Sequence, residues 1–446
     1  MKIERILFFN LSSLSQVVTA SITWKTPLII EEELMEFTFN AFYTLIAAVI
    51  VLLLGRFLVH KIDFLRRYNI PEPVAGGLVA AIVSLIVHNV WGYSITTSSE
   101  LQTSFMLIFF ASIGLSANFA KLKEGGVGLL IFLVCVASFI IVQNAVGISL
   151  ATLLGIDPLI GLIAGSITLT GGHGTAGAWG EILEVEHGIK GALALGMASA
   201  TFGLIIGGII GGPLAKLLIN RYDLAQPKTE RQIQQHDDQI KSDSLGEYVP
   251  FEYPHQVRLI TADNAITTLG LFAACLAFAE FMTGFSKGEW YELPTFVWAL
   301  GGGVILRNIL ESILHLNMFD RAIDVFGNAA LSLYLAMALL SLKLWQLADL
   351  AGPLMVILTA QTLTMALYAA FVTFRVMGKN YDAAVLAAGH CGFGMGATPT
   401  AVANMQAITN MYGPSHKAFL IVPLCGAFFV DLINATVIQL VLKFVG

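Results

Sequence analysis

Charged residues are scarce in this chain of 446 amino acids. Asp, Glu, Lys and Arg together make up 12% of the sequence, whereas apolar residues make up 56% and the mean hydropathy is +0.77. Soluble domains carry about 25% charged residues. The composition therefore excludes an ordinary soluble protein and indicates an integral membrane protein, for which the lipid bilayer is a partner and nucleic acid is not expected to be one.

Cysteine is also rare, and its four positions are isolated from one another in apolar stretches. None forms a CxxC pair or stands at metal-ligand spacing, so we expect no disulfide, no metal centre and no organic cofactor. The chain also lacks a paired catalytic constellation. A membrane enzyme that uses a histidine or carboxylate as a base is therefore strongly disfavoured. The four residues are Cys135, Cys275, Cys391 and Cys425.

Apolar stretches long enough to cross a bilayer, about 20 residues each, occur ten times. The sequence predicts an all-α polytopic membrane protein with five such helices in each half. The first five stretches are 37–59, 73–91, 101–119, 127–154 and 189–219, and the second five are 262–284, 293–310, 325–344, 352–377 and 417–444.

The two halves share residues at a fixed spacing, which indicates two copies of one fold. Five spans is an odd number, so the second copy enters the membrane from the opposite face, as in the inverted repeats of many secondary transporters. Gly171, Thr175, Ala176 and Ala178 recur as Gly396, Thr400, Ala401 and Ala403, and Ala111, Leu115, Ser116, Leu122, Gly188 and Leu195 recur as Ala336, Leu340, Ser341, Leu347, Gly413 and Leu420, all 225 positions later. Ile70-Pro71 pairs with Leu293-Pro294 at an offset of 223.

The predicted organisation has four parts: an N-terminal extension (1–36), a first repeat (37–219), a polar cytoplasmic linker (220–258) and a second repeat (259–446). Placing the loop with Lys61, Arg66 and Arg67 in the cytoplasm leaves both termini in the periplasm. The extension is uncharged from residue 6 to 24 yet rich in Ser and Thr, which leaves an amphipathic, a targeting and a disordered segment open.

Two glycine-rich segments interrupt the apolar pattern, LTGGHGTAGAWGEIL from Leu169 and GHCGFGMGATPTAVANM from Gly389. Such segments are poor lipid-facing helices because their backbone must be shielded by protein or water. We predict a re-entrant hairpin in each repeat, at about 157–183 and 381–408, with Asp157 and Asp382 as helix caps. The amino termini of the half-helices would favour anionic groups at the tips.

Polar residues at the tips are the candidate binding groups. Their hydroxyl and amide oxygens suit a weakly held alkali cation, and their backbone amides suit a carboxylate. Thr170 and Pro399 lie in the same segments. The candidates for substrate are Gly171, Gly172, His173, Gly174, Thr175, Gly394, Gly396, Thr398, Thr400 and Asn404, and those for the cation are Thr175, Thr400, Asn404, Asp431 and Asn434.

Other polar residues within the apolar stretches have both a functional and a structural interpretation. Asp431 is an intramembrane carboxylate and needs a cation or water. His390 suits proton transfer or a backbone hydrogen bond, Gln143 and Asn144 suit the substrate path or helix contacts, and Arg307 suits a substrate carboxylate or the inner interface. The GxxxG spacings at Gly203, Gly207 and Gly211 predict a helix-packing surface.

Five motifs together resemble the bacterial sodium/glutamate symporter family over about residues 37–446. The resemblance implies sodium-coupled uptake of L-glutamate across the bacterial inner membrane, inverted halves, a homodimer and an elevator-like movement. It favours sodium near Thr175, Thr400, Asn404 and Asp431 with glutamate on the tip amides. The motifs are IPEPVAGGL from Ile70, IDPLIGLIAGSITLTGGHGT from Ile156, ELPTF from Glu292, MGKNYDAAVLAAGHCGFGMGATPTAVANMQAIT from Met377 and GPSHKAFLIVPLCGAFFVD from Gly413.

Alternatives to this function remain. Inverted halves with glycine hairpins also suit a carrier of citrate, malate or aspartate, which substrate competition would separate from a glutamate carrier. An ion channel would be open to both sides at once and would conduct at rates that alternating access does not reach.

Overall fold

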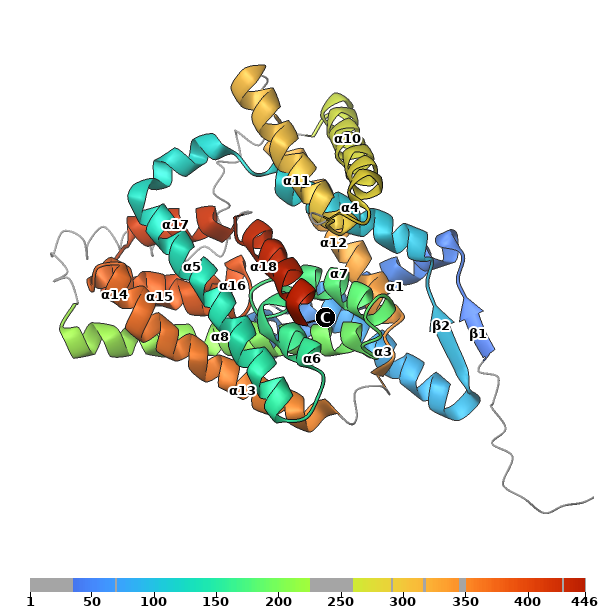
Figure 1. Cartoon of the computed structure of the whole chain (residues 1–446), viewed down its shortest axis with the longest axis horizontal. Helices are drawn as coiled ribbons and strands as arrows, with labels where there is room; N and C mark the ends of the chain where they lie inside the picture. Colours follow the sequence, from blue (N-terminus) through green and yellow to red (C-terminus); the bar gives the residue numbers. More distant parts are fainter. Residues whose placement is uncertain are drawn as a thin grey trace, which may run out of the picture. The chain divides into compact units, whose positions relative to one another are not determined.

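The computed structural model describes residues 35–68, 70–224, 260–289, 292–315, 318–344, 350–426 and 429–445. The predicted extension lies almost entirely outside the described residues, and so does most of the predicted linker, from residue 225. Residues 36–446 form one compact unit, built from the helices shown in Figure 1.

The first half contains one strand before its first helix and a second strand after the third helix, which pair as a small sheet. This sheet was not predicted, because its strands have only four residues each. The elements are β1 (Met35–Thr38), α1 (Ala41–Lys61), α2 (Asp63–Arg67), α3 (Glu72–Trp91), β2 (Tyr93–Thr96), α4 (Ser99–Leu115), α5 (Phe119–Leu153, broken at Gly126), α6 (Pro158–Leu162), the π-helix η1 (Ile163–Ile167), α7 (Gly172–Val185) and α8 (Ala192–Tyr222).

The second half follows the same order of long helices, with two further π-helical turns. Its elements are α10 (Ala262–Ser286), α11 (Thr295–Asn308), η3 (Ile309–Ile313), α12 (Asp320–Leu340), α13 (Ala351–Tyr368), η6 (Ala369–Thr373), α14 (Phe374–Val376), α15 (Tyr381–Gly394), α16 (Thr398–Tyr412), α17 (His416–Gly426) and α18 (Phe429–Val445).

Seven of the described helices are long and apolar enough to cross a membrane, and the bent pair of α17 and α18 would be an eighth. This confirms a helical, polytopic membrane protein. The predicted ten spans exceed this number by two, 101–119 and 293–310. Those stretches form α4, which has 17 residues, and α11, which has 14 before a π-helical turn interrupts it.

Residues that match between the halves occupy equivalent places in the structure. Pro71 and Pro294 are the N-caps of α3 and α11. Leu115 and Leu340 end α4 and α12. In the turns after α7 and α16, Gly188 and Gly413 have positive φ angles, and Gly413 directly follows α16.

The long helices pack as two bundles, each drawn from both halves. The first bundle contains α1, α3, α4, α10, α11 and α12, whose principal contacts are with one another. The second bundle contains α5 to α8 and α13 to α18, in which α8 packs against α7, α15 and α16. Fewer contacts join the bundles, among them those of α12 with α7 and of α11 with α18.

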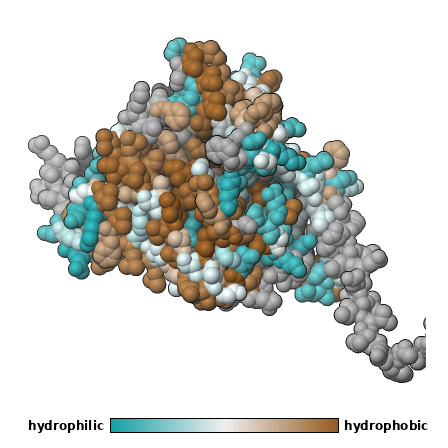
Figure 2. Space-filling model, in the orientation of Figure 1, coloured by the Kyte–Doolittle hydropathy of each residue, from teal (hydrophilic) through white to brown (hydrophobic). Residues whose placement is uncertain are grey.

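Large apolar side chains remain exposed on several helices, as expected of surfaces that face lipid. Val134 and Ile141 on α5 are 65% and 59% exposed, and Leu363 on α13 is 61% exposed. Figure 2 shows hydrophobic residues spread over much of the face in view. Because the bilayer solvates such side chains, their exposure is compatible with a stable fold only in a membrane.

Candidate functional site

The first glycine-rich segment is a helix, a π-helical turn, a short break and a second helix. Asp157 is the N-cap of α6 and accepts a hydrogen bond from the Leu159 amide at 2.8 Å, which confirms the predicted cap. Residues 168–171 form the break before α7 begins at Gly172. Gly172 has a φ of 68°, and a Cβ at this position would lie 3.3 Å from the Gly396 carbonyl oxygen. The two breaks therefore approach each other closely.

The second glycine-rich segment consists of α15 and α16, which pack against each other on either side of a break at residues 395–397. The N-cap of α15 is not the predicted residue, Asp382. Asn380 occupies the N-cap position of α15 and accepts from the Ala383 amide at 2.9 Å. Asp382 instead accepts from the Ser415 hydroxyl at 2.6 Å. The prediction was wrong because the helix begins one residue before Asp382.

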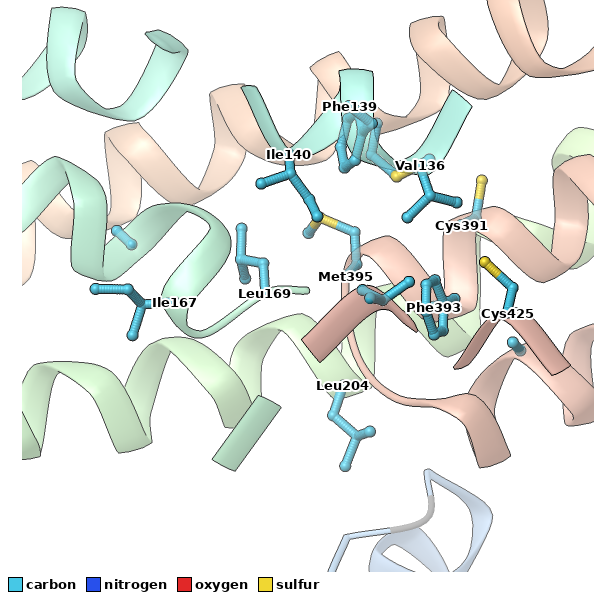
Figure 3. Close-up of a cluster of buried hydrophobic side chains, with 14 of the residues drawn as sticks. Val136, Phe139, Ile140, Ile167, Leu169, Leu204, Cys391, Phe393, Met395 and Cys425 are labelled. Atoms are coloured by element: carbon cyan, nitrogen blue, oxygen red, sulfur yellow. The ribbon is translucent and has the colours of Figure 1, made fainter. Parts of the chain in front are cut away.

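Apolar anchors and buried amides hold the two breaks in place. Leu169 and Met395 are fully buried, and Figure 3 shows both in one apolar cluster with residues of α5 and α8. The Gln143 amide donates to the Gly394 carbonyl at 3.0 Å, and its oxygen accepts from the Thr170 hydroxyl at 2.7 Å. Asn144 accepts from the Ser166 amide at 2.9 Å. Gln143 and Asn144 thus hold the segments next to the breaks, and neither lines the cavity between them.

A cavity of about 580 Å³ lies where the two breaks meet the first bundle. One wall comes from α7, α16 and α18 of the second bundle, and the opposite wall comes from α3, α4 and α12 of the first. Its lining is Pro71, Glu72, Pro73, Phe109, Ile113, Thr170, Gly171, Gly172, His173, Gly174, Leu204, Asn328, Leu331, Ser332, Leu335, Phe393, Gly396, Ala397, Thr398, Pro399, Thr400, Gly426, Val430 and Asp431.

Two helices begin at this cavity without a side-chain cap. Neither Gly171 before α7 nor Ala397 before α16 makes a side-chain cap hydrogen bond. The first N–H groups of a helix have no partner within the helix, and they carry the positive end of its dipole. At their other ends the same two segments are capped by Asp157 and Asn380. The Gly172 amide already donates to the Thr168 carbonyl at 3.0 Å, and Pro399 has no N–H. The amides left for a ligand at the cavity are those of the other first-turn residues, His173 and Gly174 on α7 and Thr398 and Thr400 on α16.

Most of the predicted substrate residues meet at this cavity. Thr175, Gly394 and Asn404 do not line it. Thr175 is buried within α7, and the Gly394 carbonyl accepts from Gln143. The predicted residues that do line it are Gly171, Gly172, His173, Gly174, Gly396, Thr398 and Thr400.

Two of the predicted cation ligands, Thr400 and Asp431, line the same cavity. The Thr400 hydroxyl is buried without a hydrogen-bond partner. Asn404 instead donates to the carbonyls of Gly207 at 2.8 Å and Ala388 at 3.3 Å, which joins α16 to α8 and α15. Asn434 donates to the Ser166 carbonyl at 2.9 Å and does not line the cavity.

The two histidines have different surroundings. His173 lines the cavity, and its Nε2 lies 3.0 Å from the Thr201 hydroxyl, which itself donates to the Met197 carbonyl. His173 Nε2 therefore carries a proton and donates to Thr201. His390 is fully buried, with Nδ1 2.7 Å from the Thr373 hydroxyl and aromatic rings around it, and it packs inside the second bundle away from the cavity.

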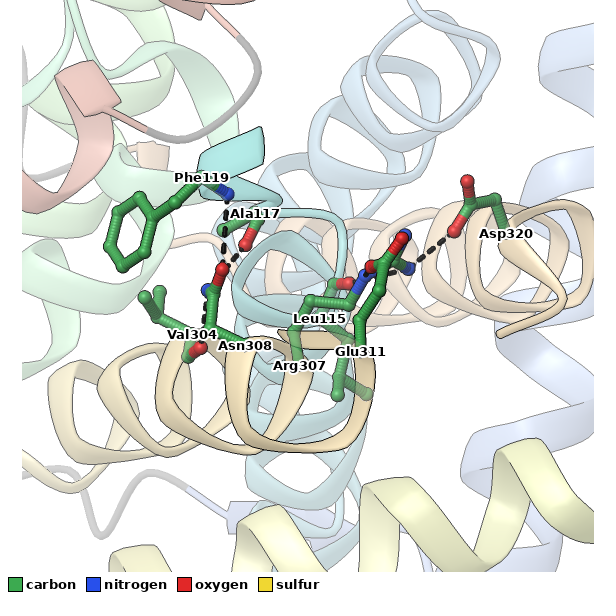
Figure 4. A network of polar contacts seen from close by, with 8 residues as sticks. All are labelled: Leu115, Ala117, Phe119, Val304, Arg307, Asn308, Glu311 and Asp320. Carbon is green, nitrogen blue, oxygen red and sulfur yellow. Dashed lines mark hydrogen bonds and ion pairs between the residues drawn. The ribbon is translucent and has the colours of Figure 1, made fainter. Parts of the chain in front are cut away.

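Arg307 is used within the first bundle. Its guanidinium pairs with Glu311 at 2.6 Å and with Asp320, and it donates to the Leu115 carbonyl at 3.2 Å (Figure 4). Its side chain is 3% exposed and does not line the cavity. Arg307 therefore ties α11 to α4 and α12, and the interpretation that it binds a substrate carboxylate is not supported.

The glycine spacing in α8 forms the predicted packing surface, and its partner is the second glycine-rich segment. A Cβ on Gly203 would lie 2.2 Å from the Met395 carbonyl oxygen, and one on Gly211 would lie 2.3 Å from the Asn404 side-chain nitrogen. These glycines allow the backbone of α8 to approach α15 and α16 directly.

The wall from α4 and α12 was not predicted. Phe109 and Ile113 lie one turn apart on α4, and Asn328 and Ser332 lie one turn apart on α12. Asn328 and Ser332 could have been found as a polar pair at i and i+4 on an apolar helix.

Among the described residues that line the cavity, none is Lys or Arg. Glu72 pairs with Arg56 at 3.2 Å. Within the described part of the chain, no three His, Cys, Asp or Glu side chains are placed to share a metal ion. The cavity thus offers amides, hydroxyls, one imidazole and carboxylates.

Comparison with known proteins agrees with this architecture. Residues 37–414 match the family model described as sodium/glutamate symporter. The chain is 52% identical to the sodium/glutamate symporter of Escherichia coli (strain K12) over 408 residues, which is 91% of this chain and 98% of that protein. It is 50% identical to that of Haemophilus influenzae over 405 residues, with the same coverage. The chain therefore belongs to the sodium/glutamate symporter family.

Proposed function

We propose that the protein takes up L-glutamate across the bacterial inner membrane, driven by sodium through alternating access. The observation that carries this proposal is the pair of uncapped helix starts, at Gly172 and Thr398, that meet at one cavity. A substrate with two carboxylates matches two such sites. The names of the relatives, each a sodium/glutamate symporter, support the same substrate and ion.

Amide groups suit this task because the substrate must be released as well as bound. Helix amino termini bind anions through N–H groups and the helix dipole, without a buried charge that would have to be neutralised in the empty state. A cavity without Lys or Arg among its described residues carries no fixed positive charge when the substrate leaves.

Sodium binds at side-chain oxygens beside the two breaks in this proposal. The Thr400 hydroxyl, buried without a partner, is a ready ligand, and Thr175, Asn404, Asp431 and Asn434 are the further candidates. Sodium can drive uptake only if it binds the substrate-competent state more tightly than the other state. This difference in sodium affinity would arise if sodium orders the two breaks, at residues 168–171 and 395–397.

We expect Thr400→Val to raise the sodium concentration for half-maximal glutamate uptake about tenfold. A tenfold change corresponds to about 1.4 kcal/mol, which is the size of the contribution of one lost ligand or hydrogen bond. Val keeps the shape and removes the hydroxyl. Thr359→Val is the matched control, since Thr359 is exposed on α13 and its hydroxyl bonds to its own helix at 2.7 Å. An unchanged sodium dependence in Thr400→Val would remove this residue from the sodium site.

In this proposal the transport movement takes place between the two bundles. The two halves are inverted repeats, the glycine-rich segments are re-entrant hairpins, and the second bundle carries the substrate past the first in an elevator-like step. The division of each half between both bundles supports this scheme. The protein acts as a homodimer, with its termini in the periplasm and the segment 220–258 in the cytoplasm.

The substrate is tested by competition. Unlabelled L-glutamate, L-aspartate, citrate and malate are compared as competitors of labelled L-glutamate in proteoliposomes that hold the purified protein. The proposal predicts that L-glutamate competes best. Stronger competition by citrate or malate would keep the architecture and replace the substrate.

A further inference from the structure

One carboxylate at the cavity has no partner in the described structure. Asp431 lies in the first turn of α18, is partly exposed and lines the cavity. No hydrogen bond or ion pair joins it to any described residue, whereas Glu72, the other acidic residue of the lining, pairs with Arg56. An intramembrane carboxylate is costly unless a cation or water meets it. Asp431 therefore needs a cation when the cavity closes around its ligand.

Two cations can reach this position, sodium and the ammonium group that the substrate itself carries. Asn434 follows Asp431 by three residues and was expected to complete a sodium shell with it. The Asn434 amide instead donates to the Ser166 carbonyl at 2.9 Å, and Asn434 does not line the cavity. The Asn434 side-chain oxygen is buried without a hydrogen-bond partner, but it does not open onto the cavity. The residues of α18 that line the cavity therefore offer sodium no second side-chain oxygen beside Asp431.

Asp431 and the start of α16 line the same cavity. The end of α17 lies against the start of α16, because a Cβ on Gly426 would be 2.4 Å from the Thr398 hydroxyl oxygen. Gly426, Thr398 and Asp431 all line the cavity. An anion-binding helix start and a carboxylate thus face the same space. In an α-amino acid the carboxylate and the ammonium group are attached to one carbon.

We propose that Asp431 binds the α-ammonium group of the substrate, and so selects an amino acid over a dicarboxylate that lacks this group. The α-carboxylate then lies at the start of α16 and the side-chain carboxylate at the start of α7. This inference rests on the proposed function, because it assigns a role within the glutamate site.

The test compares the affinities of two ligands for each variant of the protein. L-glutamate and glutarate share a carbon skeleton and two carboxylates, and only glutamate carries the ammonium group. Their dissociation constants are measured by titration calorimetry at saturating sodium for the wild-type protein, Asp431→Asn and Asp431→Glu. Asp263→Asn is the matched control, since Asp263 is exposed at the start of α10 and away from the cavity. A ratio of two constants on folded protein does not depend on the yield of the variant.

Asp431→Asn is expected to weaken glutamate binding at least about 30-fold, the usual consequence of removing one partner of a buried charge pair. Glutarate binding is expected to change less than about threefold, so the preference for the amino acid collapses. Asp431→Glu, which keeps the charge, should retain part of the preference, and Asp263→Asn all of it.

Several results would overturn the assignment. An equal loss for both ligands, together with a higher sodium requirement, would place sodium at Asp431. Unchanged binding of both ligands would exclude any contact. If the wild-type protein binds glutarate as tightly as L-glutamate, the assignment of Asp431 is overturned and sodium-coupled uptake remains intact. If the wild-type protein binds neither ligand, the assignment and the proposed glutamate uptake are both overturned.

Discussion

Gly203→Ala is expected to abolish glutamate uptake. The added Cβ would lie 2.2 Å from the Met395 carbonyl oxygen in the second break and 2.7 Å from the Leu169 side chain in the first. The overlap with backbone can be relieved only if α8 or the second break moves by about 1 Å, and displacements of this size cost on the order of 100-fold at preorganised sites. The glutamate dissociation constant of the purified variant is the direct measurement.

Gly212→Ala is the control for this effect. Gly212 lies on the same helix, and a Cβ there would meet nothing within 4 Å. This variant should fold, bind and transport as the wild type does, because alanine also suits a helix better than glycine. Wild-type affinity in Gly203→Ala would show that the contact of α8 with the two breaks does not shape the site.

Gly177→Leu is expected to stop transport while glutamate binding stays within about threefold of wild type. Gly177 lies on α7 of the second bundle, and a Cβ there would be 2.3 Å from the Tyr334 hydroxyl on α12 of the first bundle. Gly177 does not line the cavity. A leucine would wedge the two bundles where an elevator-like step needs them to slide. Uptake by proteoliposomes and calorimetric binding separate the two effects.

Gly270→Leu provides the comparison. Gly270 is exposed on α10, with open space around a Cβ, so the same change adds an apolar side chain without a wedge. If Gly177→Leu transported at the wild-type rate, α7 and α12 would not move past each other and the elevator-like step would be lost from the proposal.

Much of the fold could be predicted because the bilayer imposes length and apolarity on every span. The predicted span 127–154 coincides within one residue with the spanning part of α5, Gly126–Leu153. A break was also predicted in each glycine-rich segment, and each segment has one. The glycines mark these breaks only roughly, because Gly172, Gly174, Gly177 and Gly180 all lie within the helix α7. Asp157 was found as a cap because Asp before Pro is a strong helix-start signal.

The remainder depended on tertiary contacts that no local pattern encodes. For Gln143 and Asn144 the sequence left both the substrate path and structural contacts open, and the structure shows bonds to backbone groups next to the breaks, those of Gly394 and Ser166. For Arg307 the sequence left a substrate carboxylate and the inner interface open, and only the structure places Glu311 and Asp320 beside its guanidinium. Asn404 and Asn434 could not be assigned to backbone carbonyls from sequence, because those carbonyls belong to distant residues such as Gly207 and Ser166.

The most direct test of the central claim is uptake of labelled L-glutamate into proteoliposomes that hold the purified protein, with an inward gradient of sodium, potassium or protons. Accumulation against the glutamate gradient with sodium alone, competed by unlabelled glutamate, is the predicted result. Accumulation driven by protons without sodium would contradict sodium coupling and direct attention to His173, the imidazole that lines the cavity between Gly172 and Gly174.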